Sequence, residues 1–128
     1  PCSFAICYDL RFPELFRHLS AMNVRVVFVP AAFTEKTGKA HWELLVRTRA
    51  VENQVFVVAV NQVGEYAGDK ASYGHSMIVD PWGTILAQAP GNEVKSREGI
   101  ITATLDFLYQ DSVRDKLPCL SHKRKDIL

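Results

Sequence analysis

The sequence is poor in cysteine, and its cysteines are not spaced as pairs. Three occur among 128 residues, Cys2, Cys7 and Cys119, and no CxxC spacing is present. An odd number without that spacing argues against both a disulfide framework and a zinc site. We therefore expect a reducing, cytoplasmic compartment and no bound metal.

The sequence also lacks long apolar runs and an excess of charge of one sign. No stretch approaches the roughly 18 consecutive apolar residues of a membrane span, and we expect no targeting leader. The formal net charge is +1, and the basic residues are scattered except for a cluster at 121–126, which we interpret as a solvated terminus. We expect neither a nucleic-acid nor a membrane partner.

What the sequence does have is enough apolar material for a core. Its hydrophobic content is 48%, which at this length favours a single domain spanning 1–128. The chain begins with Pro1 rather than methionine, and an apolar run starts almost at once, at Ser3. We expect that a preceding segment is missing and that the domain is partial.

The first half alternates between strand and helix patterns. Apolar runs at 3–7, 24–30 and 55–61 predict buried strands. A helical period over 9–22 predicts a helix whose apolar stripe is Leu15, Leu19 and Met22. A second helix is predicted over 39–53, with Thr37 as its N-cap and an apolar stripe of Trp42, Leu45, Val46 and Ala50.

The second half predicts antiparallel strands. Two β runs within 71–89 are joined by Asp80-Pro81-Trp82-Gly83, a sequence typical of a hairpin turn. A further strand is predicted over 99–106, followed by a short helix over 107–116 that Pro118 stops. The whole order indicates an α/β layer architecture.

Cys7 stands where the first apolar run meets the charged turn CYDLR. Functional groups in open α/β sheets gather beyond the carboxyl ends of the strands. A thiolate there lies near the first backbone N–H groups of the next helix, which stabilise negative charge on sulfur and on a developing oxyanion. The N–H of Tyr8 is the expected oxyanion donor. The alternative is a structural thiol, since free cysteines are usually buried.

Four segments resemble the carbon–nitrogen hydrolase (nitrilase) superfamily. CYDLRFPEL resembles its nucleophile segment, and PAAFTEKTGKAHWELLVRTRAVENQVFVVAVNQ resembles the segment that follows. ASYGHSMIVDPWGTILA is similar to a later strand pair. VRDKLPCLSHKRKDIL is similar to the end of the branch that contains omega-amidase and deaminated-glutathione amidase. The resemblance covers nearly the whole chain.

The resemblance implies an α/β fold that is the C-terminal half of a four-layer α-β-β-α sandwich. It implies an amidase in which Cys7 attacks an amide or nitrile carbon and water then hydrolyses the thioester. The expected substrate is a small carboxamide that also bears a carboxylate. Neither a metal nor an organic cofactor is implied, and a homo-oligomer is expected.

The sequence departs from the family pattern before Cys7. The family's general-base glutamate and its oxyanion-supporting lysine lie upstream of the nucleophile, where this sequence has only six residues. The missing base cannot be Glu14, Glu43 or Glu52, because these residues match family helices that follow the nucleophile. The missing lysine likewise cannot be Lys36 or Lys39. The strands here are then expected to leave an open sheet edge. Two alternatives remain: a truncated non-catalytic module, or a missing N-terminal half supplied by another chain.

The remaining conspicuous residues each have two interpretations. Arg11 binds a substrate carboxylate, or it pairs with Asp9, Glu14 or a helix-borne acid. Phe33 lines the pocket or simply packs. His41 and Trp42 form a pocket wall or a helix start, the latter being favoured for His41.

The other histidine, ion-pair and cysteine candidates are interpreted as structural or incidental. The resemblance assigns no catalytic histidine, so a pair of His75 with Cys7 is not favoured. Arg49 and Glu52 are expected to form a structural ion pair near a subunit contact. Cys2 and Cys119 are interpreted as incidental.

Overall fold

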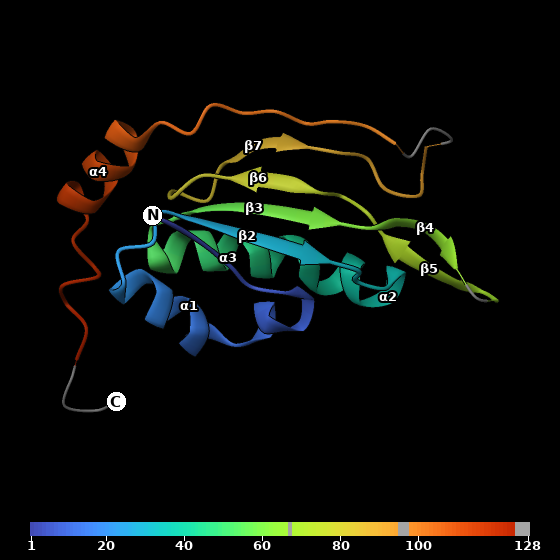
Figure 1. Ribbon diagram of the computed structural model, residues 1–128, viewed down its shortest axis with the longest axis horizontal. Helices are drawn as coiled ribbons and strands as arrows, with labels where there is room; N and C mark the ends of the chain where they lie inside the picture. Colours follow the sequence, from blue (N-terminus) through green and yellow to red (C-terminus); the bar gives the residue numbers. More distant parts are fainter. Residues whose placement is uncertain (67, 95–97, 125–128) are drawn as a thin grey trace.

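The computed structural model describes residues 1–66, 68–94 and 98–124, and within them a five-stranded sheet forms the centre (Figure 1). The strand order is β1-β2-β3-β6-β7. The bounds are β1 (Cys2–Phe4), β2 (Val26–Ala31), β3 (Phe56–Asn61), β6 (Met77–Val79) and β7 (Ile85–Gln88). The first three strands are parallel, and β6 and β7 run antiparallel to their neighbours. A two-stranded ribbon, β4 (Val63–Tyr66) and β5 (Lys70–Tyr73), extends beyond the sheet.

Helices that connect the parallel strands cover one face of the sheet (Figure 1). The 3₁₀ turn η1 (Cys7–Arg11) and helix α1 (Pro13–Ala21) join β1 to β2. Helix α2 (Glu35–Thr37), the π-helical turn η2 (Gly38–Trp42) and helix α3 (Glu43–Asn53) join β2 to β3. The core between these layers includes Phe16, Leu19, Val27, Val29, Trp42, Val46, Ala50, Val57, Ala59 and Met77. The predicted α/β layering is therefore correct.

The second helix has the predicted apolar stripe but begins earlier than predicted. Its stripe packs in the core, as expected, through Trp42, Leu45, Val46 and Ala50. The N-cap is Thr34 rather than Thr37, because the Thr34 hydroxyl accepts a hydrogen bond from the Thr37 N–H at 3.4 Å. At Gly38 the chain passes so close to β5 that a Cβ would lie 2.2 Å from Tyr73 Cγ. Packing against β5 therefore fixes the course of this turn.

The first strand and the first helix are both shorter than predicted. β1 ends at Phe4, and although the Ala5 N–H still donates to the Phe28 carbonyl at 3.0 Å, the chain then turns into η1. The prediction that Met22 belongs to the buried stripe is wrong, because this residue is 60% exposed. It follows the last residue of α1, and Asn23 adopts a φ of 62°, so the chain leaves the helix before Met22 reaches the core.

In the second half of the chain, the predicted hairpin turn at 80–83 and the predicted helix over 107–116 form, but the strand predicted over 99–106 does not. Asp80 Oδ1 accepts hydrogen bonds from the Trp82 and Thr84 N–H groups at 2.8 Å, which closes the β6–β7 hairpin. Helix α4 (Phe107–Lys116) has the predicted bounds. The strand predicted over 99–106 does not form: the recorded backbone hydrogen bonds join none of residues 99–105 to a strand of the described chain. The segment keeps only the alternating exposure of a strand.

The face of the sheet opposite α1 and α3 is apolar and partly open. The run 24–30 has the composition of a strand buried on both faces, yet Phe28 is only half-buried. Phe4 is 66% exposed and Val60 is 56% exposed. A hollow of about 520 Å³ between β3, β6 and the segment that begins at Glu98 lies beside this face. Within the described residues, this side of the sheet is therefore covered only in part.

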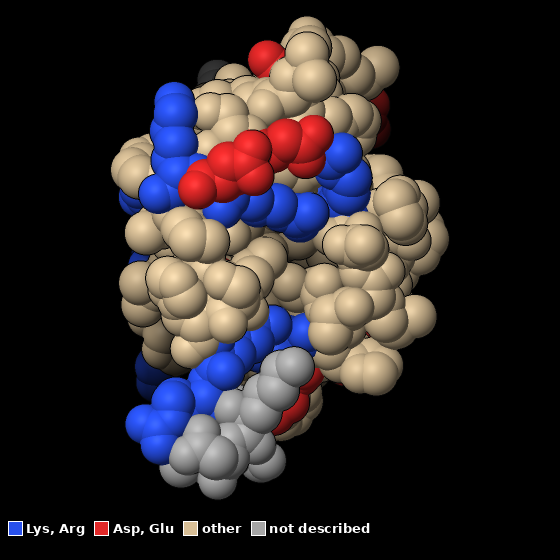
Figure 2. Space-filling model, turned by 90° about the vertical axis from the view of Figure 1, so that its left-hand side faces the viewer, with Lys and Arg blue, Asp and Glu red and all other residues tan. Residues whose placement is uncertain are grey.

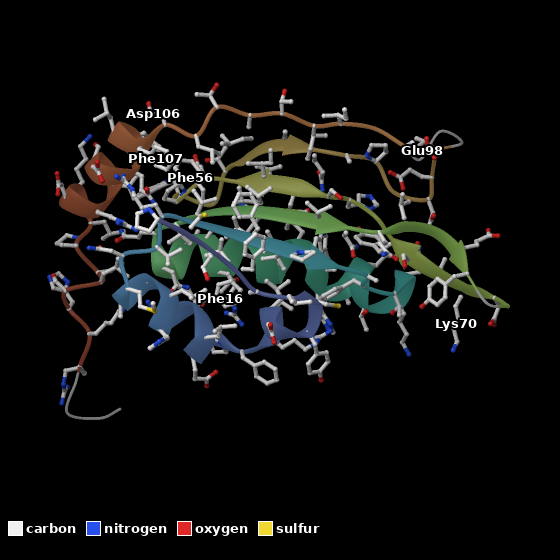
Figure 3. All side chains as sticks on the ribbon, viewed as in Figure 1. Phe16, Phe56, Lys70, Glu98, Asp106 and Phe107 are labelled. Carbon is white, nitrogen blue, oxygen red and sulfur yellow. The ribbon has the colours of Figure 1, made fainter. Side chains whose placement is uncertain are left out.

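Helix α4 docks on the end of the sheet through buried polar contacts. Gln110 is fully buried, and its side-chain amide donates to the carbonyls of Arg25 and Gln54 at 3.1 and 2.9 Å. Its Oε1 accepts from Arg25 Nε at 2.6 Å. Figure 3 shows Phe107 of α4 meeting Phe56 of β3, with ring centroids 5.8 Å apart, away from Phe16 on the helix-covered face.

Charges at this end of the molecule are mixed. Arg25 forms an ion pair with Asp111 at 2.6 Å, and in Figure 2 acidic side chains lie directly against basic ones on the face that carries α4. Positions 125 and 126 of the basic cluster lie outside the described residues. None of the described helices is both long and apolar enough to cross a membrane.

Replacing Gln110 with alanine should destabilise the fold by about 2–4 kcal/mol, because it removes three hydrogen bonds and leaves the Arg25 Nε–H without its acceptor. The Arg25 and Gln54 carbonyls keep other donors, the Phe56 N–H and the Arg114 guanidinium. Urea unfolding followed by circular dichroism measures the change, with Gln88→Ala as the exposed-glutamine control. Equal stability of the two variants would show that α4 does not depend on these bonds.

Candidate functional site

The turn that carries Cys7 is fixed by its own backbone. Cys7 adopts a φ of 47°, in the left-handed region that residues with a Cβ rarely occupy. Asp9 closes the turn from both sides: its N–H donates to the Ile6 carbonyl at 2.9 Å, and its carboxylate accepts from the Ile6 N–H at 2.8 Å. Cys7 is half-buried and packs against the core. The turn therefore holds a thiol at the boundary between core and surface.

Within the described residues, the first N–H groups of η1 have no recorded backbone acceptor and can donate to a ligand. The first N–H groups of a helix have no partner inside it. The recorded backbone hydrogen bonds of the described chain use the N–H of Asp9 but not those of Cys7 or Tyr8. The Tyr8 ring is 65% exposed. Cys7 and Tyr8 thus present a thiol and unpaired main-chain donors on consecutive residues.

Arg11 lies over two of the other predicted site residues. Its guanidinium carbon is 5.4 Å from the centroid of the Tyr8 ring and 5.3 Å from that of the Phe33 ring. The structure therefore brings Tyr8, Arg11 and Phe33 together, from η1 and from the loop after β2. Cation–π contacts of this kind are worth about 0.5–2 kcal/mol, depending on exposure.

The ion pairs considered for Arg11 do not form. The salt bridges of the described residues include none from Arg11 to Asp9, to Glu14 or to an acid on another helix. The Asp9 carboxylate is instead engaged with the Ile6 N–H. The polar contact that Arg11 does make is to His41, whose Nδ1 lies 3.4 Å from Arg11 Nη1.

Phe33 packs in the core and also supports the Arg11 guanidinium. Its side chain is 5% exposed, and its ring lies 5.0 Å from that of the fully buried Trp42. The Phe33 N–H donates to Asn61 Oδ1 at 2.8 Å, and the Asn61 amide donates to the Gly74 carbonyl at 2.8 Å. Asn61 thereby ties together the loops that follow β2, β3 and β5. Our sequence interpretation missed it, although a polar residue at the end of a buried strand was the available signal.

The His75 side chain contacts Tyr73 and Glu93. Its ring stacks on Tyr73 at 4.1 Å, its Nδ1 lies 3.0 Å from the Tyr73 carbonyl oxygen, and its Nε2 lies 3.4 Å from a Glu93 oxygen. The side-chain hydrogen bonds of the described residues include none between His75 and Cys7. The expectation that His75 and Cys7 do not form a pair stays a prediction.

Charged groups on the β5 side of the site are paired with one another. Lys39 contacts Glu35 at 3.0 Å, which lowers the pKa of Glu35 and raises the pKa of Lys39. The Gly91 N–H donates to Glu93 and lowers the pKa of that carboxyl. Burial raises the pKa of Tyr73. Lys39, Glu35 and Glu93 thus each have a partner within the scaffold beside the site.

The predicted pair of Arg49 and Glu52 is confirmed, at 2.8 Å. Arg49 is 5% exposed, and its Nε donates to the Leu10 carbonyl at 3.0 Å, so it ties α3 to the end of η1. The described residues contain no group of three or more His, Cys, Asp or Glu side chains arranged to hold a metal ion.

Asn61→Ala should lower the free energy of unfolding by about 2–4 kcal/mol, because it leaves the Phe33 N–H and the Gly74 carbonyl without partners. Gln62→Ala, at the exposed neighbouring amide, should change it by no more than about 0.5 kcal/mol. Both values come from urea titrations, and similar losses in the two variants would contradict the role given to Asn61.

Solved structures with the same fold include two eukaryotic nitrilase-superfamily proteins. The chain superimposes on the C. elegans NitFhit protein with a TM-score of 0.87 and 42% identity, covering 99% of this chain and 30% of that one. It superimposes on Saccharomyces cerevisiae Nit3, a member of branch 10 of the nitrilase superfamily, with a TM-score of 0.86 and 36% identity, covering 99% and 44%. The predicted fold class, part of a nitrilase-type α/β sandwich, is confirmed.

Curated relatives agree with the structural neighbours. The chain is 49% identical over 123 residues to a probable hydrolase, nit2, of Schizosaccharomyces pombe, covering 96% of this chain and 43% of that protein. It is 43% identical over 120 residues to the deaminated glutathione amidase of Dictyostelium discoideum, covering 94% and 40%. The chain thus spans less than half the length of these relatives. Residues 2–115 match the carbon-nitrogen hydrolase family, and the chain belongs to that family.

Proposed function

We propose that this chain carries the nucleophile and part of the substrate pocket of an amidase that cleaves small carboxamides. The observation that supports the proposal best is Cys7 itself, held half-buried at a φ of 47° beside unpaired main-chain N–H groups. The deaminated glutathione amidases among its relatives support the amide as the substrate class. No cofactor enters the proposed reaction.

In the proposed reaction the Cys7 sulfur attacks the amide carbon and forms a carbon–sulfur bond. The carbonyl oxygen becomes an oxyanion, to which the Tyr8 N–H donates; such a donor contributes roughly 3–4 kcal/mol to the transition state. The carbon–nitrogen bond then breaks, and the nitrogen leaves as ammonia or an amine after taking a proton. Water cleaves the thioester and releases a carboxylic acid and the thiol.

Arg11 and Phe33 are proposed to bind the substrate. A guanidinium that forms no ion pair within the described residues and rests on two rings is suited to receive a carboxylate in bidentate fashion. Phe33 supplies the apolar wall beneath it. The proposed substrate is therefore a short carboxamide with a carboxylate at its other end.

The alternative is that this chain alone is a folded, non-catalytic module. The side-chain hydrogen bonds and ion pairs recorded for the described residues place no glutamate or lysine on the Cys7 sulfur.

The family resemblance assigns the general base and the supporting lysine to a segment before the nucleophile. We propose that an N-terminal half supplies both, and that it covers the open sheet face around Phe4 and Val60.

We further propose that the protein is a cytoplasmic homo-oligomer. The outer side of α3 presents Leu44, 65% exposed, and Val51, 45% exposed, next to Trp82, 60% exposed, of the β6–β7 turn. Arg47 links these elements, because its Nε donates to the Gly83 carbonyl at 2.9 Å. An apolar patch on two joined elements favours a subunit contact.

Cys7→Ala should abolish ammonia release from dicarboxylic monoamides, a loss of at least about 10³-fold, since no thioester forms. Release is measured with the chain alone and with any co-purifying polypeptide. Cys119→Ala, at another half-buried free thiol, is the matched control and should retain full activity.

Activity that survives Cys7→Ala would refute the nucleophile assignment. No release by the folded wild-type chain, alone or with its partner polypeptide, would instead favour the non-catalytic module.

Leu44→Glu should reduce the oligomer mass measured by light scattering, because it places a charge in the proposed contact. Leu108→Glu, at an 81% exposed position of α4, should leave that mass unchanged. An unaltered mass for Leu44→Glu would exclude this face of α3 as the contact.

A further inference from the structure

Arg11 is held in place by partners that leave most of its hydrogen-bonding groups free. The Tyr8 and Phe33 rings support the guanidinium, and His41 Nδ1 contacts Nη1 at 3.4 Å. The hydrogen bonds recorded for the described residues show no other side-chain contact of Arg11. A guanidinium has five N–H donors, so most of the donors remain available to a ligand.

The contact with Arg11 sets the tautomer of His41. A guanidinium can only donate, so in this contact Nδ1 is the acceptor and the ring N–H is on Nε2. That Nε2–H is a second donor next to Arg11. Two donors from separate elements, η1 and η2, therefore lie together.

His41 is carried on a firmly packed turn. η2 is π-helical, a geometry that recurs at functional sites. The next residue, Trp42, is fully buried, and its indole N–H donates to the His75 carbonyl at 2.8 Å. At its other end, Gly38 lies directly against Tyr73. His41 itself is exposed, so the turn presents an accessible imidazole on a packed backbone.

We propose that His41 is a positioning residue for charge selection: its Nδ1 orients the Arg11 guanidinium so that a carboxylate-bearing substrate is preferred at Cys7. This inference rests on the proposed function, because it takes Cys7 as the reacting group. The neighbouring charges do not take the place of His41 in this role. Lys39 is paired with Glu35, and Glu43 is paired with Arg47 at 3.2 Å.

The test compares an anionic and a neutral alkylating reagent at the same thiol. Iodoacetate and iodoacetamide each transfer a two-carbon group to the thiolate with loss of iodide, and they differ in the charge at the far end. Site-resolved mass spectrometry gives the two rates at Cys7 and, as an internal reference, at the exposed Cys2. The quantity of interest is the iodoacetate-to-iodoacetamide rate ratio.

In the wild-type chain we expect this ratio to be on the order of 10-fold higher at Cys7 than at Cys2, as electrostatic focusing predicts. Arg11→Ala should remove the difference. His41→Ala should lower it about 3-fold, the typical effect of one hydrogen bond. His41→Asn, which keeps an acceptor near the Nδ1 position, should restore it to within about 2-fold, and His18→Asn is the matched exposed-histidine control.

Loss of the fold would raise both rates at the half-buried Cys7 while bringing its ratio to the Cys2 value. Loss of positioning lowers the iodoacetate rate alone, so the two rates read together separate positioning from a structural effect. A His41→Ala ratio equal to wild type, with Arg11→Ala losing selectivity, would overturn the role of His41 alone. Equal ratios at Cys7 and Cys2 in the wild-type chain would overturn the anion site but leave the nucleophile intact. A Cys7 that resists both reagents while Cys2 reacts would overturn the proposed function and this inference together.

Discussion

The parallel register of β1, β2 and β3 is the constraint on which the candidate site depends. Phe4 pairs with Phe28, and Phe28 pairs with Val58, so the three strands end at one edge of the sheet. The loop after β1 carries Cys7, and the loop after β2 carries Phe33. Because strands in a parallel sheet are joined by crossover helices, residues far apart in sequence converge at this edge.

Polar side chains fix the loops at this edge of the sheet by hydrogen bonds to the backbone. Asp9 fixes the turn that contains Cys7 by bonding Ile6 twice. Asn61 fixes the loop of Phe33. A backbone at positive φ is sparsely populated in the unfolded chain and costs about 1–3 kcal/mol to hold, which the surrounding hydrogen bonds offset. The scaffold thus maintains the position of the thiol before any ligand arrives.

The sequence predicts those elements that are determined by residues close together along the chain. Periodicity identifies α3, and the residues of the Asp80 turn identify the β6–β7 hairpin. The end of β1, the N-cap at Thr34 and the unpaired segment 99–106 depend on contacts between distant segments, which no local pattern encodes. The same holds for the site: Cys7 and Arg11 are recognisable from their shared motif, whereas the contact between Arg11 and His41 joins residues 30 positions apart.

The open face of the sheet and the site belong to the same strands. Phe4 lies three residues before Cys7, and Val60 directly precedes Asn61, yet both side chains are more than half exposed on the face opposite the helices. Any polypeptide that buries them gains about 25 cal/mol for each Å² of apolar surface removed from water. Covering this face therefore stabilises the strands whose ends carry the site residues.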